Sequence, residues 1–187
     1  MNYILRPAAA LLITAVIVVA ALSVVYNLTL EPIEKQKQKT QEAAIRDVLP
    51  GTTDFREIQI ENTGDITAVF ECTSGGTLTG YVVRLSPEGY SGNIDLITGI
   101  SASSEKISGM RIMRHSETPG LGALAVKENF YRQYDNRALA PLSVTRTSPG
   151  VNDIQAITSA TITTRAVTKA VNEAVEWYIS YKGSGVK

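Results

Sequence analysis

The stretch AAALLITAVIVVAALSVVY, residues 8–26, decides the architecture of this chain. Only Thr14 and Ser23 interrupt its apolar character, and no charged residue occurs between Arg6 and Glu31. At about 1.5 Å of rise per residue, a helix of this length spans a hydrocarbon core of roughly 30 Å. The sequence therefore predicts a single transmembrane helix near the amino terminus.

A cleavable signal peptide is the alternative interpretation of this stretch. Residues 21–23, Ala-Leu-Ser, loosely resemble a processing site built from small residues. Apolar character continues past them through residues 24–26, which favours an uncleaved anchor. Charge bias leaves the orientation open, because Arg6 precedes the helix while Lys35, Lys37 and Lys39 follow it.

Outward from the apolar stretch, the chain divides into a stalk, one folded domain and a tail. Lysines and glutamines dominate residues 31–46, which predicts a polar helix that ends in the turn at residues 48–51. A length of 187 residues suits one domain of ordinary size plus an anchor. The expected parts are an anchor (1–30), a juxtamembrane helix or stalk (31–51), a folded domain (52–182) and a flexible tail (183–187).

The folded domain combines short strands with helices. Strand-like runs separated by turn residues fill residues 55–99, with another strand at 107–114. Helical character returns near residues 126–134 and most clearly at 163–181, where apolar residues recur at spacings of three and four. The predicted fold is α+β, a transmembrane helix followed by a small, mainly antiparallel sheet packed with helices.

Charge and the rare residue types narrow the classes of function. Eighteen basic residues balance eighteen acidic ones, so no overall field draws the chain towards nucleic acid. The single cysteine, Cys72, excludes an internal disulfide and a multi-cysteine metal cluster supplied by this chain alone. No metal site and no nucleic-acid partner are expected.

A segment rich in hydroxyl groups stands immediately before the last predicted helix. It is QAITSATITT, residues 155–164, with four threonines and one serine. Hydroxyls at a helix start ordinarily cap amide N–H groups that have no carbonyl partner. The same geometry presents free N–H groups and the positive end of the helix dipole, which favour a phosphate. Composition does not separate a cap from an anion site.

A second segment, GMRIMRHSETPGLG at residues 109–122, joins a predicted strand to a turn. Pro119-Gly120 and Gly122 by themselves predict a tight turn. Glycine also lets backbone approach an aromatic plane closely. A plain turn and a ligand-binding turn are both open at this point.

These two segments resemble the covalent FMN-binding family, whose attachment motif is usually written Asp-x-x-Ser/Thr-Gly-Ala-Thr. In that family the final threonine carries the FMN phosphate, so the resemblance implies that Thr161 is the acceptor. Gln155 stands at the aspartate position and Ser159 at the glycine position. The resemblance also implies that the Glu-Thr-Pro-Gly-Leu-Gly turn lies against the flavin. The implied cofactor-binding residues are Thr158, Ser159, Ala160, Thr161, Glu117, Thr118, Pro119, Gly120, Leu121 and Gly122.

The resemblance covers most of the chain. In particular, the sequence is similar to the G subunits of Rnf complexes, and a related domain occurs in the C subunit of the Na+-translocating NADH:quinone reductase. The resemblance implies an electron-carrier subunit of an ion-translocating ferredoxin:NAD oxidoreductase, with no catalytic residue of its own and no enzyme activity alone. Implied partners are the other subunits, the lipid bilayer and a flavin transferase that installs covalent FMN. The implied location is the cytoplasmic (inner) membrane, single-pass, with the flavin domain on the extracytoplasmic side.

Two other functions remain open. One is a membrane-tethered structural or binding module without flavin. The other is a flavin reductase acting alone, which the lack of a G-x-G-x-x-G after a strand disfavours.

Four further side chains are interpreted without a role in electron transfer. His115 adjoins the turn but is equally an ordinary residue at a strand end. Cys72, in a polar and turn-prone stretch, is interpreted as incidental. Trp177 and Tyr178 are assigned to core packing.

Overall fold

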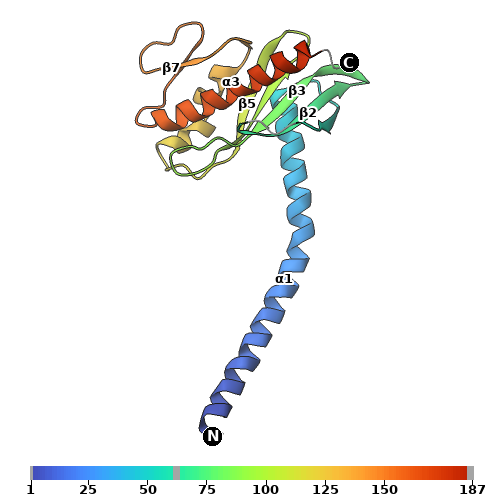
Figure 1. Ribbon diagram of the computed structural model, residues 1–187, viewed down its shortest axis with the longest axis vertical. Coiled ribbons are helices and arrows are strands. Elements are labelled where there is room, and N and C mark those ends of the chain that lie inside the picture. The colour runs from blue at the N-terminus through green and yellow to red at the C-terminus, as the bar shows by residue number, and fades with distance from the viewer. Residues whose placement is uncertain (1, 61–63, 185–187) are drawn as a thin grey trace. The chain divides into compact units, whose positions relative to one another are not determined.

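The computed structural model describes residues 2–60 and 64–184, and the chain forms two compact units, residues 1–42 and 43–187. Helix α1 (Asn2–Val48) forms the first unit as far as residue 42, and its remaining residues, from Ala43 onward, belong to the second (Figure 1). The expected tail lies partly outside the described residues, because the description ends at Ser184.

The first unit is a helix in which residues 8–30 are mostly apolar and have exposed side chains. Leu11, Ile17 and Leu22 are among the exposed residues, and the segment from Ala8 is long and apolar enough to cross a membrane. The side chains of Thr14, Asn27 and Thr29 bond back to helix carbonyls, as Thr14 Oγ1 does to the Leu11 carbonyl at 2.9 Å. Hydrocarbon suits such a surface, because leucine and valine facing water cost about 25 cal/mol per Å².

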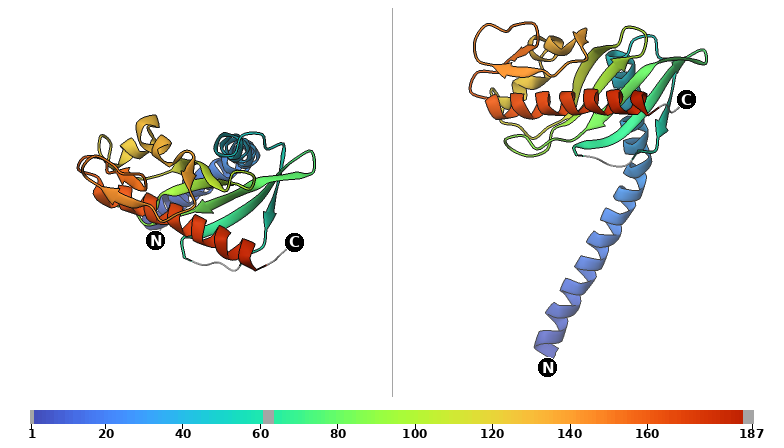
Figure 2. Two further views of the ribbon diagram at one scale, coloured as in Figure 1. Left: turned by 90° about the horizontal axis from the view of Figure 1, so that it is seen from above. Right: turned by 45° about the horizontal axis from the view of Figure 1, so that its top comes forward.

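The second unit is built on a six-stranded antiparallel sheet whose strands follow sequence order (Figure 2). The Gly75-Gly76 turn joins the second and third strands, with positive φ at both glycines as a tight hairpin requires. The predicted antiparallel sheet is thereby confirmed. Its strands are β1 (Asp54–Ile58), β2 (Ile66–Ser74), β3 (Thr77–Leu85), β4 (Asp95–Ser101), β5 (Lys106–Arg114) and β6 (Arg137–Ala138).

The two faces of this sheet bury separate apolar clusters, because side chains alternate along each strand. Helix α3 (Thr161–Gly183) covers one face, where Val167 and Val171 join a core that includes Val83 (Figure 2). The other face packs against the end of α1, where Val48 meets the cluster that contains Val82. Both helices are therefore held by burial of an apolar face on one sheet.

The final turn of α1 is part of the folded domain. The Val48 carbonyl accepts a hydrogen bond from Ser108 Oγ at 2.5 Å. A side chain at Gly99 would place its Cβ 2.5 Å from that same carbonyl, so glycine permits this approach. Arg111 Nε donates to Asp47 Oδ2 at 2.6 Å, which adds a cation near the helix carboxyl end. The region expected as a stalk thus ends inside the domain core.

The helical character predicted near residues 126–134 is present, as short helices that bury Phe130 and Tyr134. A two-stranded parallel sheet of β7 (Ser143–Thr145) and β8 (Asp153–Gln155) was not predicted, since three-residue strands carry no measurable alternation. The short helices are η1 (Gly122–Val126), α2 (Glu128–Tyr131) and η2 (Arg132–Tyr134).

Candidate functional site

The start of α3 is open at its amino end. Ala160 is the N-cap, and no side chain caps the helix. In the described part of the chain, no hydrogen bond reaches the backbone N–H groups of Thr161, Ile162 or Thr163. Ser159 precedes the cap with φ of +62°, a left-handed conformation that turns the chain into the helix. Free N–H groups and the helix dipole therefore point out of this end.

The hydroxyl groups of the segment 158–164 divide into engaged and free ones. Thr163 Oγ1 donates to Glu117 Oε2 at 2.7 Å, and its side chain is buried. Thr164 Oγ1 donates to the Ala160 carbonyl and accepts from the Ile157 N–H. These two hydroxyls are structural. The hydroxyls of Thr158, Ser159 and Thr161 make no hydrogen bond to another described residue.

The turn after β5 is set by its proline and glycine. The Leu121 N–H donates to the Thr118 carbonyl at 3.2 Å, and Gly120 has φ of +77°. Proline at the second position and a glycine with positive φ at the third are typical of a type II turn. The predicted tight turn is therefore present.

Glu117, just before the turn, is buried with only 5% of its surface exposed. Its carboxylate accepts hydrogen bonds from the Tyr90 N–H at 2.7 Å, the Ser91 N–H at 3.1 Å and Thr163 Oγ1. Burial raises the pKa of the Glu117 carboxyl, but these hydrogen bonds, together with the nearby His115, lower it by more, so the net pKa lies below its usual value. The buried group is thus held as a carboxylate.

The turn and the start of α3 meet around a cavity of about 390 Å³. Seven of the ten predicted cofactor-binding residues line it, while Thr158, Pro119 and Gly120 do not. The sequence reasoning missed four lining residues, because Tyr90 and Arg146 come from loops remote in sequence and nothing in the motif pattern distinguished Ile162 or Thr163. The lining residues are Tyr90, Glu117, Thr118, Leu121, Gly122, Arg146, Ser159, Ala160, Thr161, Ile162 and Thr163.

The cavity lining combines positively charged groups with an apolar rim. Arg146, on the connection between β7 and β8, is exposed and forms no ion pair within the described chain. It shares the cavity with the free N–H groups at the start of α3, a combination that attracts an anion. Tyr90, Leu121 and Ile162 are exposed apolar side chains on the same lining. This combination suits a ligand that carries both a phosphate and a flat apolar ring.

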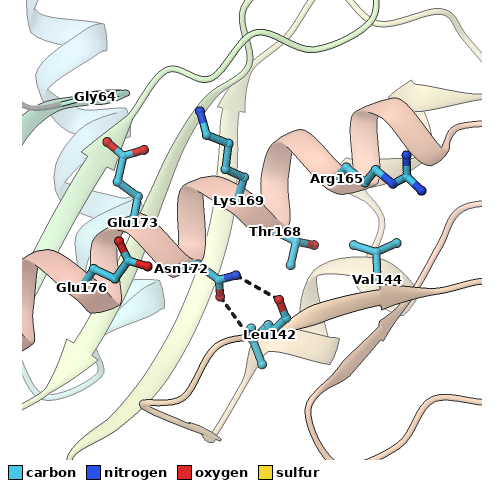
Figure 3. A pocket seen from close by; sticks show the side chains of 9 residues that line it. All are labelled: Gly64, Leu142, Val144, Arg165, Thr168, Lys169, Asn172, Glu173 and Glu176. Atoms are coloured by element: carbon cyan, nitrogen blue, oxygen red, sulfur yellow. Dashed lines mark hydrogen bonds between the residues drawn. The ribbon is translucent and has the colours of Figure 1, made fainter.

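A second, larger cavity of about 640 Å³ runs beside α3 and contains none of the motif residues (Figure 3). Figure 3 shows the Asn172 amide bridging to the backbone of Leu142, which it does through both its oxygen and its nitrogen. Lys169 pairs with Asp65 Oδ2 at 2.9 Å, and Glu173 Oε1 accepts from the Asp65 N–H at 2.6 Å. These polar groups tie α3 to its neighbours, so the smaller cavity is the candidate site.

Other residues singled out in the sequence lie elsewhere. Cys72 is fully buried within β2, so the expectation of a polar, turn-prone setting was wrong; burial raises the pKa of its thiol to about 11. His115 Nδ1 accepts a hydrogen bond from the Glu117 N–H at 3.2 Å. Tyr178 is buried and Trp177 packs against the core, which confirms their assignment. The Gln155 backbone bonds to the Gln133 side chain.

The sequence matches two families along its length. Residues 89–176 match the FMN-binding domain, and residues 1–48 match the RnfG N-terminal region. The G subunit of an ion-translocating oxidoreductase complex from Methanosarcina acetivorans is 31% identical over 181 residues, which covers 92% of this chain and 95% of that protein. The G subunit of a Na+-translocating ferredoxin:NAD+ oxidoreductase complex from Acetobacterium woodii is 34% identical over 184 residues, with coverage of 90% and 88%.

Among solved structures, the C subunit of the Na+-translocating NADH-quinone reductase from Parabacteroides distasonis superposes with a TM-score of 0.61 and 16% identity. The superposition covers 80% of this chain and 95% of that one, so the two share a fold. The two G subunits extend the likeness to sequence over nearly the whole length. The chain, with its candidate membrane helix and its FMN-binding domain, belongs to the family of G subunits of ion-translocating Rnf oxidoreductase complexes.

Proposed function

We propose that the chain carries electrons within such a complex through an FMN esterified by its phosphate to Thr161. One observation carries this assignment. Of the five hydroxyls in residues 158–164, those of Thr163 and Thr164 are committed to hydrogen bonds. Thr158 lies outside the cavity. Thr161 stands at the first helical position, lines the cavity and keeps its hydroxyl free.

The charges around Thr161 support a phosphoester there. A phosphate on the Thr161 hydroxyl would lie at the amino-terminal end of α3, where unbonded N–H groups and the helix dipole stabilise negative charge. Arg146 lines the same cavity and supplies a guanidinium for a charge-assisted hydrogen bond. The Ser159 hydroxyl is the competing acceptor, but it stands two residues before the helix, away from the free N–H groups.

The apolar rim supports placement of the isoalloxazine ring. Tyr90 is 69% exposed, and Leu121 and Ile162 add apolar surface on the same lining. A flat ring that covers these side chains removes them from water, which favours binding by about 25 cal/mol per Å² of apolar area. The turn at residues 118–121 thus serves as one wall of the site.

When bound, FMN supplies one- and two-electron redox chemistry, and the protein fixes its position and tunes its potential. Thr161 is an attachment point. Arg146 and the start of α3 balance the phosphate charge. His115 already accepts a hydrogen bond from the Glu117 backbone through Nδ1, so it serves the turn through that nitrogen. No side chain of this site is assigned a proton-transfer role.

The membrane helix determines the setting of this electron carrier. The segment from Ala8 anchors the domain in the cytoplasmic membrane. We place the flavin domain on the extracytoplasmic side of that membrane. The Acetobacterium woodii relative is a subunit of a Na+-translocating ferredoxin:NAD+ oxidoreductase. We infer partners of the same kind here, namely the other subunits of a membrane redox complex, and a flavin transferase for maturation.

Intact mass spectrometry of the full-length chain, produced with an active flavin transferase, tests the attachment site. The wild-type chain is expected to gain the mass of one esterified FMN, and Thr161→Ala is expected to lose it. Thr158→Ala and Ser159→Ala are the matched controls, because each removes a free hydroxyl of the same segment, and both keep the added mass. Flavin retained in Thr161→Ala refutes the assigned residue, and a bare wild-type chain supports a structural module instead.

A further inference from the structure

We propose that Glu117 is a positioning residue that holds three walls of the flavin cavity together through hydrogen bonds to the protein. This inference rests on the proposed function, because it takes the flavin to occupy that cavity. The motif resemblance implied a polar contact between Glu117 and the cofactor. The contacts of its carboxylate assign it a different task.

Both carboxylate oxygens of Glu117 are bonded to protein groups. Oε1 accepts from the backbone N–H groups of Tyr90 and Ser91, at 2.7 and 3.1 Å. Oε2 accepts from Thr163 Oγ1 at 2.7 Å. These donors lie 26, 27 and 46 residues away in sequence. One side chain therefore joins the loop after β3, the turn after β5 and the start of α3.

Two glycines make room for this carboxylate. A Cβ at Gly89 would lie 2.4 Å from Glu117 Oε1, and a Cβ at Gly122 would lie 2.2 Å from Oε2 and 2.6 Å from Thr163 Oγ1. Separations this short do not occur between non-bonded atoms, so any side chain at either position displaces the carboxylate. The turn glycine at 122 is explained by its contact with Glu117, without reference to a ligand.

Glu117 forms no ion pair among the described residues, so its charge is stabilised by these three hydrogen-bond donors. A buried carboxylate with three good donors is a strong and directional tie. Two of the three donor residues, Tyr90 and Thr163, line the cavity, and Ser91 follows Tyr90 in the same loop. Tyr90, held through its own N–H, presents its ring on the lining, and Thr163 stands two residues from the attachment point at Thr161. Loosening Glu117 thus frees the walls against which the ring lies, while Thr161 keeps its hydroxyl.

The test compares Glu117→Ala with Glu117→Gln in the full-length flavinylated chain. The isoalloxazine ring is achiral, so its visible circular dichroism reports how rigidly an asymmetric site holds it. With one FMN per chain by mass, Glu117→Ala is expected to lose most of the visible dichroism. Glu117→Gln is expected to recover much of it, because an amide oxygen still accepts from Tyr90 and Ser91 while the Thr163 hydroxyl rotates to accept from the amide nitrogen.

Glu173→Ala is the matched control. Glu173 also accepts a backbone N–H, that of Asp65 at 2.6 Å, and a Cβ at Gly64 would lie 2.0 Å from its carboxylate. It lies outside the flavin cavity, so its loss destabilises the domain without changing the flavin dichroism. If Glu117→Ala does not fold, Thr163→Val, which removes a single donor, is expected to lose part of the visible dichroism and to keep the rest.

The outcomes separate the two proposals. Unchanged visible dichroism in folded Glu117→Ala or Thr163→Val chains that carry FMN overturns the positioning role and leaves the proposed function standing. An equal loss in Glu173→Ala overturns it too, since general destabilisation then explains the effect. A wild-type chain without flavin overturns the proposed function, and the positioning role with it.

Discussion

Replacing Ser159 with glycine is expected to stabilise the folded domain, although the substitution removes a side chain. Ser159 has φ of +62°, and its hydroxyl makes no hydrogen bond to another described residue. A left-handed conformation costs a residue with a Cβ roughly 1–2 kcal/mol. Glycine avoids this strain but loses about 0.5–1 kcal/mol more backbone entropy on folding. The difference predicts a gain of about 0.5–1 kcal/mol in the free energy of unfolding.

Chemical denaturation of the full-length chain in detergent measures this gain. Trp177 is the only tryptophan, and its ring stacks on Tyr181 with centroids 5.0 Å apart, so its fluorescence reports unfolding of the domain. The denaturation midpoint of Ser159→Gly should rise with an unchanged slope. Ser159→Ala retains the Cβ and should gain nothing. Asn136→Gly should gain less, because asparagine tolerates its φ of +58°. A Ser159→Ala chain as stable as Ser159→Gly would refute the reasoning.

Three further predictions concern charge, pH and reactivity. Arg146→Gln should slow flavin attachment about fivefold, as for an exposed charge pair worth about 1 kcal/mol, measured by mass against time; Arg165→Gln, outside the flavin cavity, should not. The Glu117 pKa lies below its usual value of 4.5, so its stabilising contribution is complete above that value and is lost as the pH falls through the lowered pKa. The denaturant concentration at the midpoint of unfolding should therefore decrease as the pH is lowered below about 4.5, and it should decrease less steeply in Glu117→Gln than in the wild type. Cys72 is fully buried with a pKa of about 11, so iodoacetamide should label it only after unfolding, and labelling of the native chain would contradict its place in the core.

Local periodicity predicted those parts of the fold in which the pattern of apolar residues along the sequence determines which side chains are buried. The β-type run of residues 80–85 forms β3, and the helical spacing of Val167 and Val171 places one face of α3 on the core. The helical character around Phe130 was also predicted, whereas its division into three short helices was not. The β7–β8 pair has no local pattern, because each strand is only three residues long.

The motifs located the candidate site but did not describe its walls. Thr161 and Leu121 could be predicted to lie near each other because the resemblance to the covalent FMN-binding family implies that both motifs contact the flavin. Arg146 and Tyr90 could not, since each sits in an ordinary loop and reaches the cavity only through the tertiary fold. Glu117 was predicted to belong to the site, whereas its bonds to distant backbone groups became visible only in three dimensions.

Helix α3 also fixes the spacing between Trp177 and the proposed attachment point of the flavin. Trp177 follows Thr161 by 16 residues on this one helix, a separation of about 24 Å along its axis at 1.5 Å per residue. Indole emission overlaps flavin absorption, so a flavin esterified to Thr161 quenches Trp177 by resonance energy transfer. The excited-state lifetime of this single tryptophan thus becomes an unlabelled measure of cofactor occupancy in purified chains.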